Sequence, residues 1–173
     1  MAGEHYEWNG PPPSDIAKAP LPSPTVSIAP TSPQSLFYAR NLRRAAAALA
    51  KRFKSNELIL STALYPSEPE AIVGANGQAR IVTIAATSKV KVGVPGTFEN
   101  AASGITIPEL DPRVPERLAR LIDSRYRVPT SALGRFALAF FPHELDGWGI
   151  YDASGQARFQ AYLNGEALER IHR

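Results

Sequence analysis

A four-residue sequence, Gly-Gln-Ala-Arg, occurs twice in the chain, and both copies lie where a β-hairpin is expected. The first copy begins at Gly77, directly after Asn76, and the second begins at Gly155, directly after Ser154. Short runs of residues that favour β-strands flank each copy, and Asn-Gly or Ser-Gly between two such runs is typical of a tight hairpin. Glycine provides the positive φ that such a turn requires. The two copies therefore predict two hairpins, one in each half of the chain.

Each predicted hairpin follows an amphipathic helix and a strand. In the first half, the helix is expected over residues 33–54, with Ser32 as its N-cap, and the strand over residues 57–65. In the second half, the helix is expected to begin after Asp111, and the strand covers residues 135–141.

The same order of elements in both halves indicates an internal duplication, with units at about residues 33–92 and 111–173. Two helix-strand-hairpin units would form one antiparallel sheet with both helices packed on one face. The predicted fold class is therefore α+β, in a single domain over residues 33–173. We expect an irregular connection over residues 93–110 and a last short helix that begins at Asn164.

The first 32 residues differ in composition from the rest of the chain. They are rich in Pro, Ser and Ala, and they include Pro11-Pro12-Pro13. Proline has no backbone N–H and favours the extended polyproline conformation. The sequence therefore predicts a disordered, Pro-rich tail over residues 1–32.

The composition argues against several classes of protein. The chain has no cysteine, so disulfides and thiolate chemistry are excluded. No apolar stretch is long enough to span a bilayer, and no signal-peptide pattern is visible, so we expect no transmembrane segment and a cytoplasmic location. Phosphate-binding and dinucleotide-binding loops are missing, and no cofactor is predicted. The net charge of +3 is too small by itself to indicate nucleic-acid binding.

The first predicted helix has a one-sided charge distribution. Residues 34–54 contain six basic residues and no acidic residue. At 100° per residue, most of these cations project opposite to the apolar residues Leu42 and Leu49. Arginines also gather on one side of the second helix. The candidate binding residues are Arg40, Arg43, Arg44, Lys51 and Lys54 on the first helix and Arg113, Arg117 and Arg120 on the second.

We interpret these surfaces as the functional feature of the chain. Basic helix faces bind phosphates, anionic lipids or acidic proteins, although many such faces are only solvated. The expected function is a non-catalytic interaction or regulatory module whose basic helix face meets an anionic partner, either an acidic protein or a nucleic acid.

Two alternatives remain open. His143, Glu144 and Asp146 lie within four residues of one another and could act as the acid and base of a small enzyme. They could also supply part of a metal site, but no second cluster of ligands is visible, so no metal site is predicted. The other alternative is a ligand-sensing domain, with an apolar pocket between the helices and the sheet.

Overall fold

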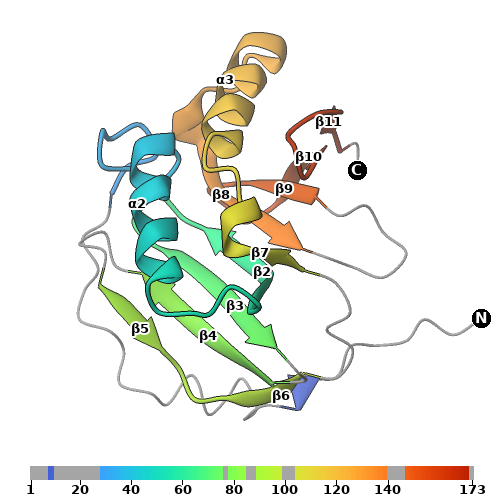
Figure 1. Cartoon of the computed structure of the whole chain (residues 1–173). Coiled ribbons are helices and arrows are strands. Elements are labelled where there is room, and N and C mark those ends of the chain that lie inside the picture. The colour runs from blue at the N-terminus through green and yellow to red at the C-terminus, as the bar shows by residue number, and fades with distance from the viewer. Residues whose placement is uncertain are drawn as a thin grey trace, which may run out of the picture.

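The computed structural model describes residues 8–9, 28–75, 78–84, 89–98, 104–139 and 147–171. Over these residues, one antiparallel sheet of eleven strands carries two α-helices, α2 (Ala39–Ala50) and α3 (Val114–Tyr126) (Figure 1). The predicted α+β class is therefore confirmed. The helices of the described part do not have the length and apolar composition that crossing a bilayer requires.

The strands are mostly short. They are β1 (Trp8–Asn9), β2 (Leu58–Leu64), β3 (Pro69–Ala75), β4 (Gln78–Ile84), β5 (Val90–Val92), β6 (Gly96–Phe98), β7 (Ile105–Thr106), β8 (Leu133–Ala139), β9 (Gly147–Asp152), β10 (Ala157–Tyr162) and β11 (Glu169–Arg170). Two 3-10 turns, η1 (Ile107–Glu109) and η2 (Thr130–Ala132), complete the described elements.

The strand order in the sheet is β1-β6-β4-β3-β2-β8-β9-β10-β11, with β5 also paired to β4 and β7 to β2. The centre of the sheet is the antiparallel pair of β2 and β8, in which Thr62 lies opposite Leu138. β3 and β4 flank this pair on one side, and β9 and β10 flank it on the other. A strand from each half of the chain therefore lies in the middle of the sheet, and the strands nearest the two ends, β1 and β11, lie at its edges.

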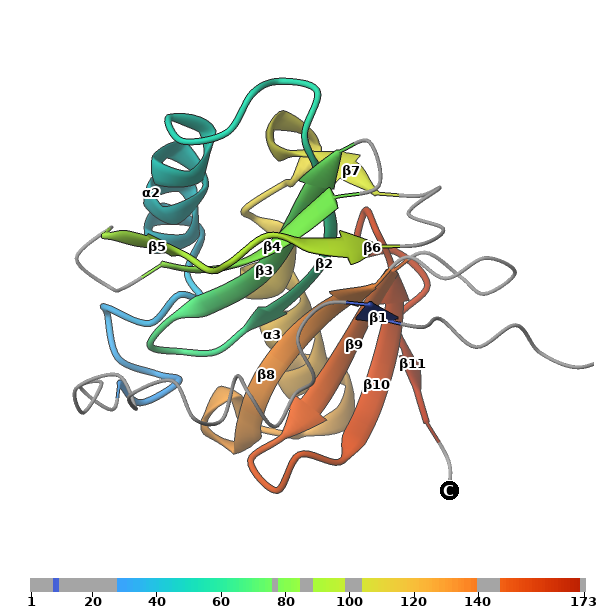
Figure 2. The same cartoon turned by 90° about the horizontal axis from the view of Figure 1, so that it is seen from below.

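Both helices lie on one face of the sheet (Figures 1 and 2). α2 buries Leu42, Ala45 and Leu49, which are spaced three and four residues apart and so share one side of the helix. Beneath the helices lies Phe136 of β8, which is fully buried. Its ring packs edge-on against Phe37 and Trp148, with centroid distances of 4.9 and 6.5 Å. The core therefore lies between the helices and the central strands.

Within the described part of the chain, no helix covers the opposite face of the sheet (Figure 2). Because side chains alternate along a strand, the neighbours of the buried core residues point to this face. In the row that crosses β2, β8 and β9, these neighbours are Ala63, Ala137 and Gly149, which lie directly opposite one another. We call this surface the helix-free face.

α2 begins later than predicted. Ser32 does not cap it, because residues 30–37 form turns and the helix starts at Ala39. Tertiary contacts hold the preceding segment: Ser35, Leu36 and Phe37 are buried, and the N–H of Leu36 donates to the carbonyl of Pro66 at 2.9 Å. The predicted start was therefore wrong. Ser35, Leu36 and Phe37 are buried in a non-helical segment instead of forming the first turn of the helix.

The second half also differs from its prediction at both ends. Asp111 lies three residues before α3, and its carboxylate accepts the N–H of Arg113 at 3.0 Å. The short helix predicted from Asn164 is wrong. The side chain of Asn164 accepts the N–H of Glu166 at 3.0 Å within a turn, and β11 follows. Such Asn side-chain bonds favour a turn over continued helix.

Two further predictions concern connecting segments. Residues 93–110, predicted to be irregular, contain β6, β7 and η1. Most of the predicted disordered tail lies outside the described residues, although Trp8–Asn9 pairs with β6 as strand β1. The Asn76-Gly77 turn also lies outside them, whereas Gly155 has the expected positive φ, +83°.

Candidate functional site

The cations predicted on the first helix all lie on its solvent side. Arg40, Arg43, Arg44, Lys51 and Lys54 are exposed, and we call this group the α2 basic face. Lys51 is the C-cap of α2, and Lys54 follows in the next turn. Among the residues that the structure describes, no ion pair includes any of these five side chains.

The exposed side chains between the two groups of cations are small. Ala47 and Ala50 are exposed between the two groups of basic residues. The surface is therefore cationic without exposed large apolar or aromatic groups.

The three candidate arginines at the second helix, Arg113, Arg117 and Arg120, are different, because each has a partner. Arg113 holds the carboxylate of Asp111 with two parallel hydrogen bonds, from Nε to Oδ1 at 3.0 Å and from Nη2 to Oδ2 at 3.1 Å. The hydrogen bond from Arg113 lowers the pKa of Asp111 below its usual value. Both charges of this pair are thus compensated within the chain.

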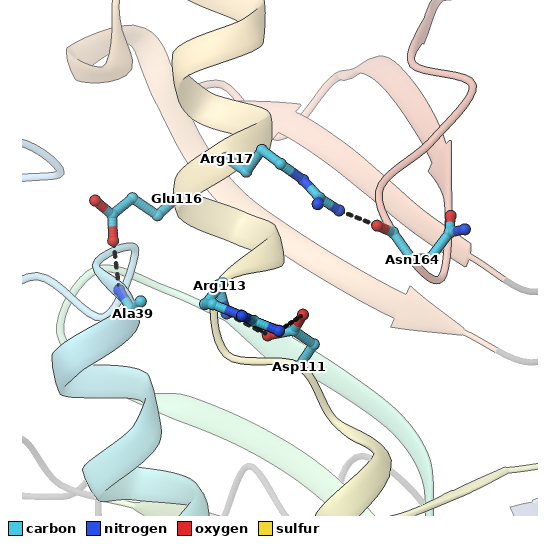
Figure 3. Close-up of polar contacts among 6 residues, drawn as sticks. All are labelled: Ala39, Asp111, Arg113, Glu116, Arg117 and Asn164. Carbon is cyan, nitrogen blue, oxygen red and sulfur yellow. Dashed lines mark hydrogen bonds and ion pairs between the residues drawn. The ribbon is translucent and has the colours of Figure 1, made fainter.

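Glu116 and Arg117 point in opposite directions from α3 (Figure 3). Glu116 pairs with Arg120 one turn later and also accepts the N–H of Ala39 at 2.9 Å. Arg117 instead donates to the carbonyl of Asn164, on the side away from α2. Arg117 therefore points away from α2, whereas Arg120 shares its partner Glu116 with the first residue of α2.

Two open depressions flank Arg117 and the turn that follows β10. One, of about 600 Å³, is lined by Glu109, Asp111 and Glu166 as well as Arg117. The other, of about 560 Å³, is lined by Arg117 and Leu121 among others. Within the described parts of the chain, no three His, Cys, Asp or Glu side chains are grouped so as to hold a metal ion.

The space between α2 and the sheet is small. It measures about 20 Å³ and is lined by apolar residues that include Leu42, Leu49 and Trp148. Pockets for small molecules usually measure about 300–1,000 Å³. The packing at this position therefore does not favour the ligand-sensing alternative.

His143, Glu144 and Asp146 lie outside the described residues. The hypothesis of an enzyme that uses these side chains stays a prediction.

One polar cluster of the structure has no clear signal in the sequence. Arg135 lies on the helix-free face between Tyr65 and Tyr151. The alternation around Phe136 and Leu138 indicates which face Arg135 occupies. No local signal links it to Tyr65, which is 70 positions away in the sequence.

No family model matches the chain, and neither the curated proteins nor the solved structures include a significant match to it.

Proposed function

We propose that this chain is a non-catalytic interaction module whose α2 basic face binds an acidic segment of a partner protein. One contrast carries the proposal: the five exposed cations of this face form no ion pair within the described residues, whereas Arg113 and Arg120 on α3 do.

The α2 basic face is unfavourable for the isolated chain. Arg40 and Arg44 are separated by one helical turn, and like charges at this spacing cost about 0.2–0.5 kcal/mol per pair. Both lie in the N-terminal half of α2, where the helix dipole disfavours positive charge. An acidic ligand would relieve both effects.

The chemistry of the face favours carboxylates on a protein over other anionic partners. Insertion into a lipid surface requires exposed large apolar side chains, and this face offers only alanines between its cations. Stacking of single-stranded bases requires aromatic side chains, which the face also lacks. The net charge of the whole chain is only +3, so the positive field is local. The planar guanidinium group of arginine can donate two parallel hydrogen bonds to a carboxylate.

The length of α2, which carries Arg40, Arg43 and Arg44, indicates the minimum length of segment that the face would hold. The 12 residues of α2 extend over about 18 Å, which equals roughly five residues of extended chain. A short acidic segment is therefore sufficient to cover it.

A fluorescence anisotropy titration with a labelled ten-residue peptide of Glu and Gly tests this proposal. We expect saturable binding that weakens steeply as salt is added. The variant R40Q/R43Q/R44Q should bind more weakly than the wild type. The variant K89Q/K91Q/R170Q is the matched control, because it also removes three exposed cations. Lys91 lies in β5, Lys89 directly precedes this strand, and Arg170 lies in β11.

Duplex DNA and anionic lipid vesicles serve as competing probes in the same assay. Equal weakening by both variants would show a general charge effect and contradict the proposal. Tighter binding of DNA or vesicles than of the peptide would contradict the choice of partner.

We also propose that the two halves are copies of one helix-strand-hairpin unit. The element order supports this, since α2 precedes β2, β3 and β4, and α3 precedes β8, β9 and β10. The sheet order β4-β3-β2-β8-β9-β10 is also symmetric about the central pair. A tandem chain of two copies of residues 104–171 should then fold cooperatively into a sheet with two central β8 strands. A tandem chain that stays unfolded would contradict the equivalence of the halves.

A further inference from the structure

Arg135 of β8 occupies the helix-free face, in a row of polar groups with one residue of β9 and the residue that follows β2. Its cross-strand partner on β9 is Tyr151. On the other side, Leu64 of β2 lies opposite Phe136, which brings the next residue, Tyr65, beside Arg135. The guanidinium is therefore flanked by a tyrosine on each side.

Both tyrosines hold the guanidinium in place. Its Cζ atom lies 4.1 Å from the centroid of the Tyr151 ring, within the range of a cation–π contact. Its Nη1 donates a hydrogen bond to the hydroxyl of Tyr65 at 3.3 Å. The Tyr151 ring lies over Gly149, where a Cβ atom would come within 3.1 Å of ring atom Cε2. The glycine thus leaves the space that the ring occupies.

The Nε–H of Arg135 has no acceptor within the described segments. This atom is buried, and no described residue accepts a hydrogen bond from it. Arg135 also forms no ion pair with an acid among the residues described. Buried donors in folded proteins are nearly always paired, so an orphaned donor beside a surface indicates a missing acceptor.

Two other arginines of the chain show what the Nε side of a guanidinium group binds. Arg113 uses Nε and Nη2 together to hold a carboxylate, and the Nε of Arg158 donates to a carboxylate oxygen of Asp152 at 2.6 Å. In Arg135, Nη1 is occupied by Tyr65. The other edge of the Arg135 guanidinium, formed by Nε and Nη2, corresponds to the edge with which Arg113 binds the carboxylate of Asp111.

We propose that Arg135 is the anchor of a carboxylate-binding site on the helix-free face. The Nε–Nη2 edge donates two parallel hydrogen bonds to the carboxylate, the Tyr151 ring supports the guanidinium, and the Tyr65 hydroxyl sets its orientation. The adjacent row of β2, β8 and β9 presents Ala63, Ala137 and Gly149, so these strands form a flat, apolar floor beside the guanidinium. This site is distinct from the α2 basic face, which lies on a helix of the other side of the sheet.

NMR of the arginine Nε–H groups tests the site directly, because each group gives its own signal. The probes are benzoate, as a free acid, and an acetylated and amidated peptide whose one acidic residue is Glu. We expect the Arg135 signal to shift saturably with at least one probe, and the better probe identifies the source of the carboxylate. The Arg113 signal should not shift, since Asp111 already occupies that edge.

The substitution Arg135→Lys keeps the charge but removes the Nε–Nη2 edge, and it should weaken binding by about tenfold or more. Tyr65→Phe removes only the orienting hydroxyl and should weaken binding less. Circular dichroism and thermal melting check that both variants fold. R40Q/R43Q/R44Q should bind these probes as the wild type does.

Three results would overturn the proposal. The first is the lack of a saturable shift with both probes. The second is tighter binding of inorganic phosphate than of either carboxylate. The third is a scalar coupling, in the free protein, between the Arg135 Nε–H and an acceptor of the chain itself.

Discussion

The carboxylate of Glu116 on α3 accepts a hydrogen bond from the backbone N–H of Ala39, the first residue of α2, at 2.9 Å. α2 has no side-chain cap of its own, because Tyr38 is at its N-cap position. The charge of Glu116 lies at the positive end of the helix dipole, in a helix whose first turn contains no acid. An acid from one helix therefore caps the other.

Replacing Glu116 with Ala should lower the free energy of unfolding by about 1 kcal/mol, the usual cost of losing an N-cap. Urea denaturation measures this change, and amide hydrogen exchange should quicken in the first turn of α2. Arg120→Ala is the control, because it removes the ion pair to Glu116 but leaves the cap. Its cost should be no more than about 0.5 kcal/mol. Equal losses in the two variants would contradict a capping role.

The variant R40Q/R43Q/R44Q should be as stable as the wild type or slightly more stable. It removes like-charge neighbours at helical spacing, each worth about 0.2–0.5 kcal/mol. Thermal melting at low salt measures the change, which should shrink as salt screens the charges. A clear loss of stability would mean that these arginines pair with acids of the chain.

Asp152 should make stability depend on pH. Its carboxylate accepts hydrogen bonds from Ser154 and Arg158, and these lower its pKa well below the usual value. A lowered pKa in the folded state stabilises the fold at pH values above the unfolded pKa, about 3.9. The stabilisation is lost as pH falls through the folded pKa.

The variant D152N should therefore be less stable than the wild type at pH 7, and the difference should shrink below about pH 4. Urea denaturation between pH 7 and pH 3 follows both proteins. Arg158→Gln removes only one of the contacts and should show the same trend with a smaller difference. A gap between wild type and D152N that stays constant with pH would contradict this prediction.

Phe136→Ala should be severely destabilising, by about 3–5 kcal/mol, because it opens a cavity in the core. Phe136 is fully buried and contacts the rings of Phe37 and Trp148. Leu121→Ala is the control, since Leu121 on α3 is 40% exposed. Its effect on the free energy of unfolding should stay within about 0.5 kcal/mol.

Local patterns in the sequence predicted the main helices and strands well. The alternation at Phe136 and Leu138 predicts β8, and the apolar spacing of Leu42 and Leu49 predicts the buried side of α2. The ends of the helices were predicted less well. Ser32 and Pro33 have the local features of a helix start, but the burial of the residues after them outweighs that preference.

The partners of the charged residues could not be predicted, because they depend on contacts between distant segments. Arg117 resembles the other basic candidates in the sequence, yet it donates a hydrogen bond to the backbone carbonyl of Asn164. The cluster of Arg135 with Tyr65 likewise exists only once β2 and β8 are paired. Periodicity identifies the face of a side chain, but its neighbours follow from the register of the sheet.

The pairing of β2 with β8 has a consequence for synthesis of the chain on the ribosome. β8 begins roughly 70 residues after β2 ends. At a synthesis rate of about 5–20 residues per second, the edge of β2 that pairs with β8 stays unpaired for several seconds. Unpaired strand edges are templates for other chains, so the nascent first half is the stage at which this protein is most exposed to exchange of strands between molecules.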